Sequence, residues 1–166
     1  MSGSLLIYNA RLVDRDTDTP GAVLASGGAL VCVRTGAGAR EACEAFARSL
    51  PDASAVEAID ARGLVLMPAF VDLHAHFRDP GYTHKEDLVS GMRAAAAGGY
   101  STVVLMANTN PVVSDGAAAA EVRSRAAASG IADVYQAVSL TRNFDGRDTS
   151  ALGALDPLAV PVATED

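Results

Sequence analysis

Strand-like segments recur about every thirty residues through the second half of the sequence. Apolar, β-branched segments begin near residues 69, 100, 133 and 160, and segments of helical character lie between them. This spacing is the size of one βα unit, and successive βα units build a parallel sheet with helical crossovers. We therefore expect an α/β fold, with strands over 69–75, 100–107, 133–140 and 160–164 and helices over 85–97, 115–129 and near 150–155.

The expected helices carry recognisable end signals. Gly98-Gly99 follows the first of them and suits a helix C-terminus, where a residue in the left-handed region is common. Ser114 precedes the second as the expected N-cap, and Gly130 ends it. Both helices are therefore expected to be short crossovers of the βα type.

The first sixty residues have a different pattern, typical of a small β-rich unit with one helix. Pro20-Gly21 and Gly27-Gly28 indicate turns. Cys43, Phe46, Ala47 and Leu50 are spaced as one face of an amphipathic helix, which Pro51 ends. We expect strands over 5–13, 29–34, 56–60 and 64–67, a helix over 39–50, and a domain division into 1–67 and 68–166.

Four βα units are half of a closed (β/α)₈ barrel, which takes about 250 residues. The segment from Ala69 to Asp166 supplies about half of that length. Two interpretations follow. The segment is either a small open α/β sheet or the front part of a larger barrel.

Composition excludes several classes of protein. Thirteen Lys and Arg against twenty Asp and Glu give a net charge of −7, so we expect no nucleic-acid partner. The two cysteines, Cys32 and Cys43, form no Cys-x-x-Cys motif, which favours a reducing cytoplasm. The longest apolar stretch, 63–71, contains Pro68 and is about half of the ~20 residues that a membrane span requires, so no membrane association is expected.

Asp72-Leu73-His74-Ala75-His76 is the most informative stretch. Alternation along a strand predicts that Asp72, His74 and His76 share one face, with the two imidazoles close enough to chelate one divalent ion. The alternative is a pair of structural or exposed histidines. Asp72 is expected to be an orienting or structural acceptor, because ligating imidazoles need such a partner.

Other polar residues follow the expected strands. Arg78 lies two residues after the histidine pair, and its planar guanidinium suits a carboxylate or phosphate, although an ordinary turn also explains it. Asn108 ends the second strand, where parallel sheets bind ligands, although turn chemistry alone also explains an Asn at this point. Thr164-Glu165-Asp166 ends the fourth strand, where a carboxylate could complete a metal site, but terminal acidic residues are commonly exposed. His84 is expected at the surface.

These residues together resemble the dihydroorotase branch of the amidohydrolase superfamily, in particular its bacterial type I members. The resemblance rests on 67–81, which reads MPAFVDLHAHFRDPG, on Lys85-Glu86, on 94–100 and on 106–111, which reads MANTNP. It covers essentially the whole chain, although the first sixty residues match only in their strand-rich pattern. Ala69 and Ala107 depart from the usual Gly and Pro, and neither change removes a functional side chain.

The resemblance implies the N-terminal portion of a (β/α)₈ barrel preceded by a small β-sandwich segment. It implies one or two zinc ions, held by His74, His76 and Asp166, with Arg78 and Asn108 on the substrate carboxylate. The implied reaction is the reversible interconversion of L-dihydroorotate and N-carbamoyl-L-aspartate in pyrimidine biosynthesis, in which zinc polarises the carbonyl and lowers the pKa of the attacking water. Allantoinases and hydantoinases share the histidine pair but lack the Arg and the Asn-Thr-x-Pro stretch.

Members of this family are longer than this chain, and their remaining histidine ligands and catalytic Asp lie on later strands. We therefore expect the chain to be one part of a cleaved or split enzyme, or of a longer one, and inactive by itself. Its expected partner is a complementary polypeptide carrying the rest of the barrel, with a homodimer also possible. The competing hypothesis is a non-catalytic dihydroorotase-like structural or regulatory partner of aspartate transcarbamoylase.

Overall fold

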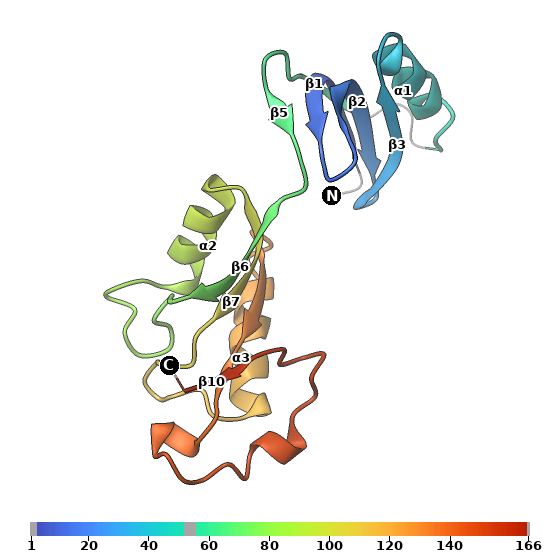
Figure 1. Ribbon diagram of the computed structural model, residues 1–166. Helices are drawn as coiled ribbons and strands as arrows, with labels where there is room; N and C mark the ends of the chain where they lie inside the picture. Colours follow the sequence, from blue (N-terminus) through green and yellow to red (C-terminus); the bar gives the residue numbers. More distant parts are fainter. Residues whose placement is uncertain (1–2, 52–55, 166) are drawn as a thin grey trace. The chain divides into compact units, whose positions relative to one another are not determined.

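The computed structural model describes residues 3–51 and 56–165, which fall into two compact units, Met1–Pro68 and Ala69–Asp166 (Figure 1). The expected boundary was between 67 and 68. Each unit is described by itself below. No helix in the described ranges is long and apolar enough to cross a membrane.

The first unit is built on one five-stranded sheet. Its strand order is β3-β2-β1-β4, and β5 pairs with the far end of β1. The pairs β1–β2 and β2–β3 are antiparallel, whereas β4 and β5 run parallel to β1. The elements are β1 (Ser4–Val13), β2 (Asp18–Ser26), β3 (Ala29–Thr35), α1 (Ala39–Ala47), β4 (Val56–Asp60) and β5 (Val65–Leu66).

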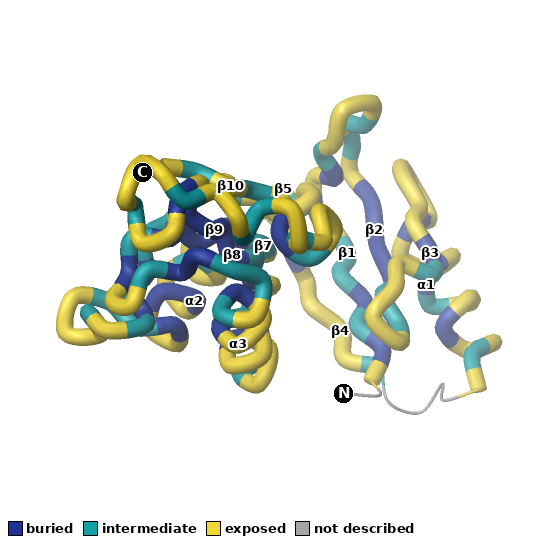
Figure 2. Tube along the Cα trace, turned by 90° about the horizontal axis from the view of Figure 1, so that it is seen from below, coloured by how far each residue is buried: buried dark blue, intermediate teal, exposed yellow. Residues whose placement is uncertain are grey.

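Helix α1 packs on one face of this sheet through small residues. Ala39, Cys43 and Ala47 are buried, and they cluster with buried side chains of β1, β2 and β3. Figure 2 shows the buried stretch along β2. The helix ends at Ala47, so Leu50 lies in the turn that follows, and Phe46 is 38% exposed rather than part of the buried face.

The expected turn at Pro20-Gly21 is wrong, because both residues lie inside β2. The chain reverses earlier, where Asp14 N–H donates to the Thr17 carbonyl. Gly21 is needed at its position because a Cβ there would lie 2.4 Å from the Arg34 carbonyl oxygen and 2.6 Å from a methyl group of Leu12. The glycine that resembled a turn signal is thus a packing requirement.

The described part of this unit contains a single sheet, and the expected β-sandwich, to which this segment would contribute one part, stays a prediction. Helix α1 covers one face of that sheet. A smaller buried cluster lies apart from the helix and contains Ala10, Leu12, Val23 and Ala61. The unit is therefore a sheet with one helix, as far as the structure describes it.

The second unit has the expected parallel α/β pattern. Strands β6, β7 and β8 form one parallel sheet in that order. Strand β9, which directly follows β8, pairs in parallel with the later strand β10. The described strands do not close a barrel. The elements are β6 (Phe70–Ala75), α2 (Leu88–Ala97), β7 (Tyr100–Leu105), α3 (Gly116–Ala127), β8 (Asp133–Gln136), β9 (Val138–Ser139) and β10 (Ala163–Thr164), with 3₁₀ turns at Arg142–Phe144 and Leu152–Ala154.

Both crossover helices cover the same face of this sheet. Met92 of α2 and Val122 of α3 join one buried cluster with Val103 and Leu105 of β7. The alternate β7 residue Val104 belongs to a separate small cluster on the opposite face. Figure 2 shows the buried stretch along β8 and β9 and the exposed outer turns of α3. Helices therefore cover one face of the sheet, as in the wall of an α/β barrel. Strand β6, which carries the histidines, lies at the edge of the three-stranded sheet.

Two helix starts differ from the expectation. Helix α2 begins at Leu88 rather than 85, because the Asp87 carboxylate caps it by accepting from the Val89 and Ser90 N–H groups. Helix α3 is capped by Asp115, whose Oδ1 accepts from Ala118 N–H at 2.9 Å, and not by Ser114. The Ser114 hydroxyl instead accepts hydrogen bonds from the Ser139 hydroxyl and from a backbone N–H in the β9–β10 connection.

Candidate metal centre

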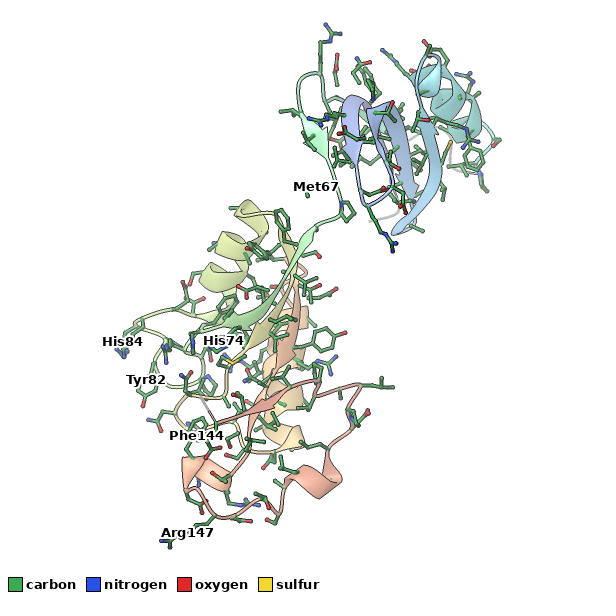
Figure 3. The ribbon with its side chains drawn as sticks, in the orientation of Figure 1. Met67, His74, Tyr82, His84, Phe144 and Arg147 are labelled. Carbon is green, nitrogen blue, oxygen red and sulfur yellow. The ribbon has the colours of Figure 1, made fainter. Side chains whose placement is uncertain are left out.

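His74 and His76 meet at the carboxyl end of β6. Their Nε2 atoms lie 3.1 Å apart, and the ring centroids are 4.9 Å apart. Figure 3 labels His74 near the end of this strand, with Tyr82 and His84 on the loop that follows. His74 is exposed and His76 is half-buried, so the pair borders solvent.

This geometry fits two ligands of one zinc ion. With Zn–N bonds of about 2.0–2.1 Å and a tetrahedral angle, two ligand nitrogens lie about 3.3–3.4 Å apart. The observed 3.1 Å requires only a small rotation of the rings. The structure thus brings together the two histidines that the sequence singled out, in an arrangement that can chelate a metal ion.

Asn108 holds the ring of His76. Its side-chain oxygen lies 3.0 Å from Nδ1 of His76, across the gap between the end of β6 and the loop after β7. An amide oxygen accepts, so the hydrogen-bond network assigns the proton to Nδ1 and leaves the lone pair of a neutral ring on Nε2. That is the tautomer a zinc ligand needs, and the sequence did not reveal that Asn108 supplies this partner.

Asp72 does not share the role of the two histidines. The pairing of β6 with β7 shifts between Asp72 and Ala75, so three residues of β6 span two of β7, and strict alternation is lost. Asp72 Oδ1 accepts from the backbone N–H of His74 at 2.9 Å. Asp72 also lines a cavity of about 240 Å³ between β6 and α2, together with His76 and Glu86. Asp72 is therefore a structural acceptor, which is one of the two roles, orienting or structural, expected for it from the sequence.

Arg78 begins the loop that follows the histidine pair. Its backbone is in the left-handed region, with φ of 59°, and its carbonyl accepts from Tyr82 N–H at 2.9 Å. The residue is half-buried, and among the described residues its guanidinium makes no ion pair. The loop thus places Arg78 directly after the histidine strand, and its guanidinium is outside any ion pair within the described ranges.

The other residues considered from the sequence are Glu165, Asp166 and His84. The Glu165 carboxylate accepts from the backbone N–H and the hydroxyl of Thr141, so it holds the loop after β9. Asp166 lies outside the described residues. His84 is exposed and faces the Tyr82 ring. Within the described ranges, no group of three or more His, Cys, Asp or Glu side chains could hold a metal ion.

One ion pair close to the site was missed from the sequence. Asp79, which is 5% exposed, accepts from Nη2 of Arg125 through both carboxylate oxygens at 2.6 Å. Arg125 lies 46 residues further along, on helix α3. The only local signal is Asp79 itself, an acid in a turn next to the histidine pair.

Comparison with known proteins places the chain in a family. Residues 63–158 match the model of a family described as Dihydro-orotase-like. Dihydroorotase from Streptococcus thermophilus (strain CNRZ 1066) is 43% identical over 159 residues, which cover 94% of this chain and 34% of that protein. Dihydroorotase from Clostridium botulinum (strain Eklund 17B / Type B) is 40% identical over 143 residues, with 86% and 32% covered.

The solved structures that match this chain include hydantoinases. L-Hydantoinase (dihydropyrimidinase) from Arthrobacter aurescens matches with a TM-score of 0.62 and 25% identity, over 87% of this chain and 29% of that one. D-Hydantoinase from Thermus sp. matches with a TM-score of 0.57 at 21% identity, over 82% of this chain and 28% of that one. The chain spans about a third of the length of the curated relatives it matches. With the family match extending over more than half of its residues, this chain belongs to the dihydro-orotase-like family.

Proposed function

We propose that this chain carries part of the active site of a zinc-dependent dihydroorotase. The enzyme would interconvert L-dihydroorotate and N-carbamoyl-L-aspartate reversibly, a step of pyrimidine biosynthesis. The single observation that carries the proposal is the convergence of the His74 and His76 Nε2 atoms at 3.1 Å, in a chain of the dihydro-orotase-like family. The competing activity is hydrolysis of a hydantoin or a related cyclic amide, as the names of the structural relatives suggest.

His74 and His76 would hold the zinc. When bound, zinc supplies Lewis-acid chemistry, because it polarises a carbonyl group and lowers the pKa of a water molecule. A hydrogen bond within the chain favours metal binding by one of these histidines. Asn108 would keep His76 in the tautomer whose Nε2 can bind the metal.

Arg78 and Asn108 would bind the carboxylate of the substrate. A guanidinium offers two parallel donors to a carboxylate, and that of Arg78 has no ion-pair partner within the described part of the chain. The Asn108 amide has two N–H hydrogens besides the oxygen that faces His76, so it can also donate to an anion. A carboxylate held by both groups would orient the cyclic amide toward the metal.

We further propose that residues beyond the described ones complete the metal site. Two histidines are fewer than the three protein ligands usual at a catalytic zinc, and the described part of the chain offers no third ligand beside them. Strand β6 also lies at the edge of its sheet, with Phe70, Val71 and Leu73 each about half exposed or more. Further strands that cover this edge would bring the remaining ligands. Asp166 stays a proposed ligand.

The test is a substrate comparison with the enzyme that contains this chain. L-dihydroorotate, hydantoin and allantoin are supplied separately, and the ring-opened product is measured for each. We expect turnover of dihydroorotate, and its loss on treatment with a zinc chelator and recovery with added zinc. Turnover of hydantoin alone would favour the competing activity. No turnover by a zinc-loaded enzyme would favour a non-catalytic role.

A further inference from the structure

The buried carboxylate of Asp79 has no part in the chemistry described so far. It lies three residues after His76 and directly after Arg78, in the loop that joins β6 to α2. Its side chain is 7% exposed, and Nη2 of Arg125 donates to both of its oxygens at 2.6 Å. A buried charge of this kind is strongly destabilising when its partner is removed, so the pair is a fixed link between the loop and α3.

The same loop is also fastened to the segment that carries Asn108. Asn110 N–H donates to the Pro80 carbonyl at 3.1 Å. Gly81, with φ of 92°, approaches Asn110 so closely that a Cβ would lie 1.9 Å from the Asn110 carbonyl oxygen. Two backbone contacts and one ion pair therefore join the loop after β6 to the βα unit formed by β7 and α3.

These links fix the relative positions of Arg78 and Asn108. Arg78 stands next to Asp79, and Asn108 stands two residues before Asn110, so the contact between the loops sets the spacing of the two side chains. The ion pair and the hydrogen bond between His76 and Asn108 are the links made by side chains, and the ion pair holds the residue adjacent to Arg78. A misplacement of about 1 Å in a group that orients the substrate can cost up to about 100-fold in catalytic efficiency.

We infer that Arg125 is a positioning residue that holds the Arg78 guanidinium in register with Asn108, so that the two together fit a substrate carboxylate. The inference rests on the proposed function, because it presumes that Arg78 and Asn108 bind the substrate. Arg125 acts through Asp79 and makes no contact with the substrate. Its removal should loosen the Arg78 loop and weaken substrate binding, and it should leave the zinc ligands in place.

The first experiment measures amide hydrogen exchange in the chain itself. The reporters are the N–H groups of Tyr82, bonded to the Arg78 carbonyl, and of Asn110, bonded to the Pro80 carbonyl. In Arg125→Met, we expect both amides to exchange at least about tenfold faster, while Gly91 N–H in helix α2 keeps its rate. Unchanged exchange at Tyr82 and Asn110 would overturn the inference.

The matched control is Arg123→Met on the same helix. The Arg123 guanidinium lies over the Tyr135 ring at 4.8 Å, and its Nη1 donates to the Ala159 carbonyl, away from the Arg78 loop. This variant removes a guanidinium from α3 and should leave both reporter amides unchanged. Arg125→Lys, which keeps the charge, should restore part of the protection that Arg125→Met loses. Equal effects of Arg123→Met and Arg125→Met would contradict a specific role for Arg125.

The second experiment measures dihydroorotate kinetics in the enzyme that contains this chain. Arg125→Met should raise KM about tenfold with kcat within about threefold, and should leave the bound zinc unchanged. The double variant Arg78→Met/Arg125→Met should have the KM of Arg78→Met, because both changes act on one interaction. Additive effects, or loosened amides with an unchanged KM, would overturn the inference. An inactive wild-type enzyme would refute the proposed function instead, and the amide exchange would still decide whether Arg125 holds the loop.

Discussion

Nδ1 of His76 lies 3.0 Å from the side-chain oxygen of Asn108, and this hydrogen bond connects the end of β6 to the segment after β7. Each residue could be assigned a separate role from the sequence alone. In the structure, the second residue orients the first. We therefore propose that Asn108 serves the candidate metal centre as well as the substrate site proposed above.

Replacement of Asn108 tests this relationship. Asn108→Leu removes the acceptor that fixes the His76 tautomer, and the loss of such a partner typically lowers metal affinity 10- to 100-fold. Asn108→Asp keeps an acceptor at the same place and should bind zinc at least as tightly as the wild type. The measurement is zinc affinity by competition with a coloured chelator. Equal affinity in Asn108→Leu and the wild type would show that the bond does not serve the metal.

Replacement of Arg78 should separate substrate binding from metal binding. Arg78→Met removes the carboxylate donors without changing a metal ligand, so we expect KM for dihydroorotate to rise at least about 100-fold while the zinc content stays constant. His84→Gln, on the same loop and exposed, is the control and should leave both quantities unchanged. A loss of zinc from Arg78→Met would show that the proposed roles are assigned to the wrong residues.

The sequence predicted the parts of the fold that depend on local spacing. The parallel strands of the second unit recur every thirty residues or so, and the pattern of β6, β7, β8 and β10 follows that expectation. The strand β2 was missed because Pro20 and Gly21 resemble a turn. Gly21 is required instead because a side chain there would clash with Leu12 and with the Arg34 carbonyl. Local signals do not distinguish a glycine that bends the chain from one that makes room for a neighbour.

The contacts of the site depend on register between distant segments, which no local pattern reports. The shift in pairing between β6 and β7 moves Asp72 out of strict alternation with His74. The same register brings Asn108 to His76, and the packing of α3 brings Arg125 to Asp79. The histidine pair was predictable because His74 and His76 lie two residues apart on one strand, and this spacing can be read directly from the sequence.

The buried thiol of Cys43 in the first unit can be tested through the pH dependence of the unit's stability. The Cys43 thiol is buried against β2 and β3, 3.4 Å from the sulfur of Cys32, and burial together with that contact raises the pKa of Cys43 from its ordinary value of 9.0 to about 11. The folded state therefore holds this proton more tightly than the unfolded state. The contribution is fully present below pH 9 and is lost as the pH rises toward 11.

This contribution is measured as the free energy of unfolding in urea at several pH values. The comparison with Cys43→Ala isolates it, because the variant lacks the group that ionises. We expect the stability advantage of the wild type over the variant to be constant up to about pH 8 and to shrink between pH 9 and 11. A constant difference across this range would contradict the buried, protonated thiol.

The N-cap of helix α3 gives a test of the second unit. Asp115 Oδ1 accepts from Ala118 N–H at 2.9 Å, and removal of such a cap costs about 1 kcal/mol. Asp115→Ala should lower the free energy of unfolding by that amount, as measured by urea denaturation. Glu121→Ala on the exposed side of the same helix is the control and should change it by less than about 0.5 kcal/mol. An unchanged free energy of unfolding in Asp115→Ala would contradict the assignment of Asp115 as the cap.

The central claim is that His74 and His76 bind zinc together. The most direct measurement is the zinc content of the purified enzyme that contains this chain, determined by mass spectrometry of the metal for the wild type, His74→Ala and His84→Ala. We expect one or two zinc ions per chain in the wild type and in His84→Ala, and a loss of zinc in His74→Ala. A wild-type enzyme that is free of zinc and does not take it up on titration would contradict this claim.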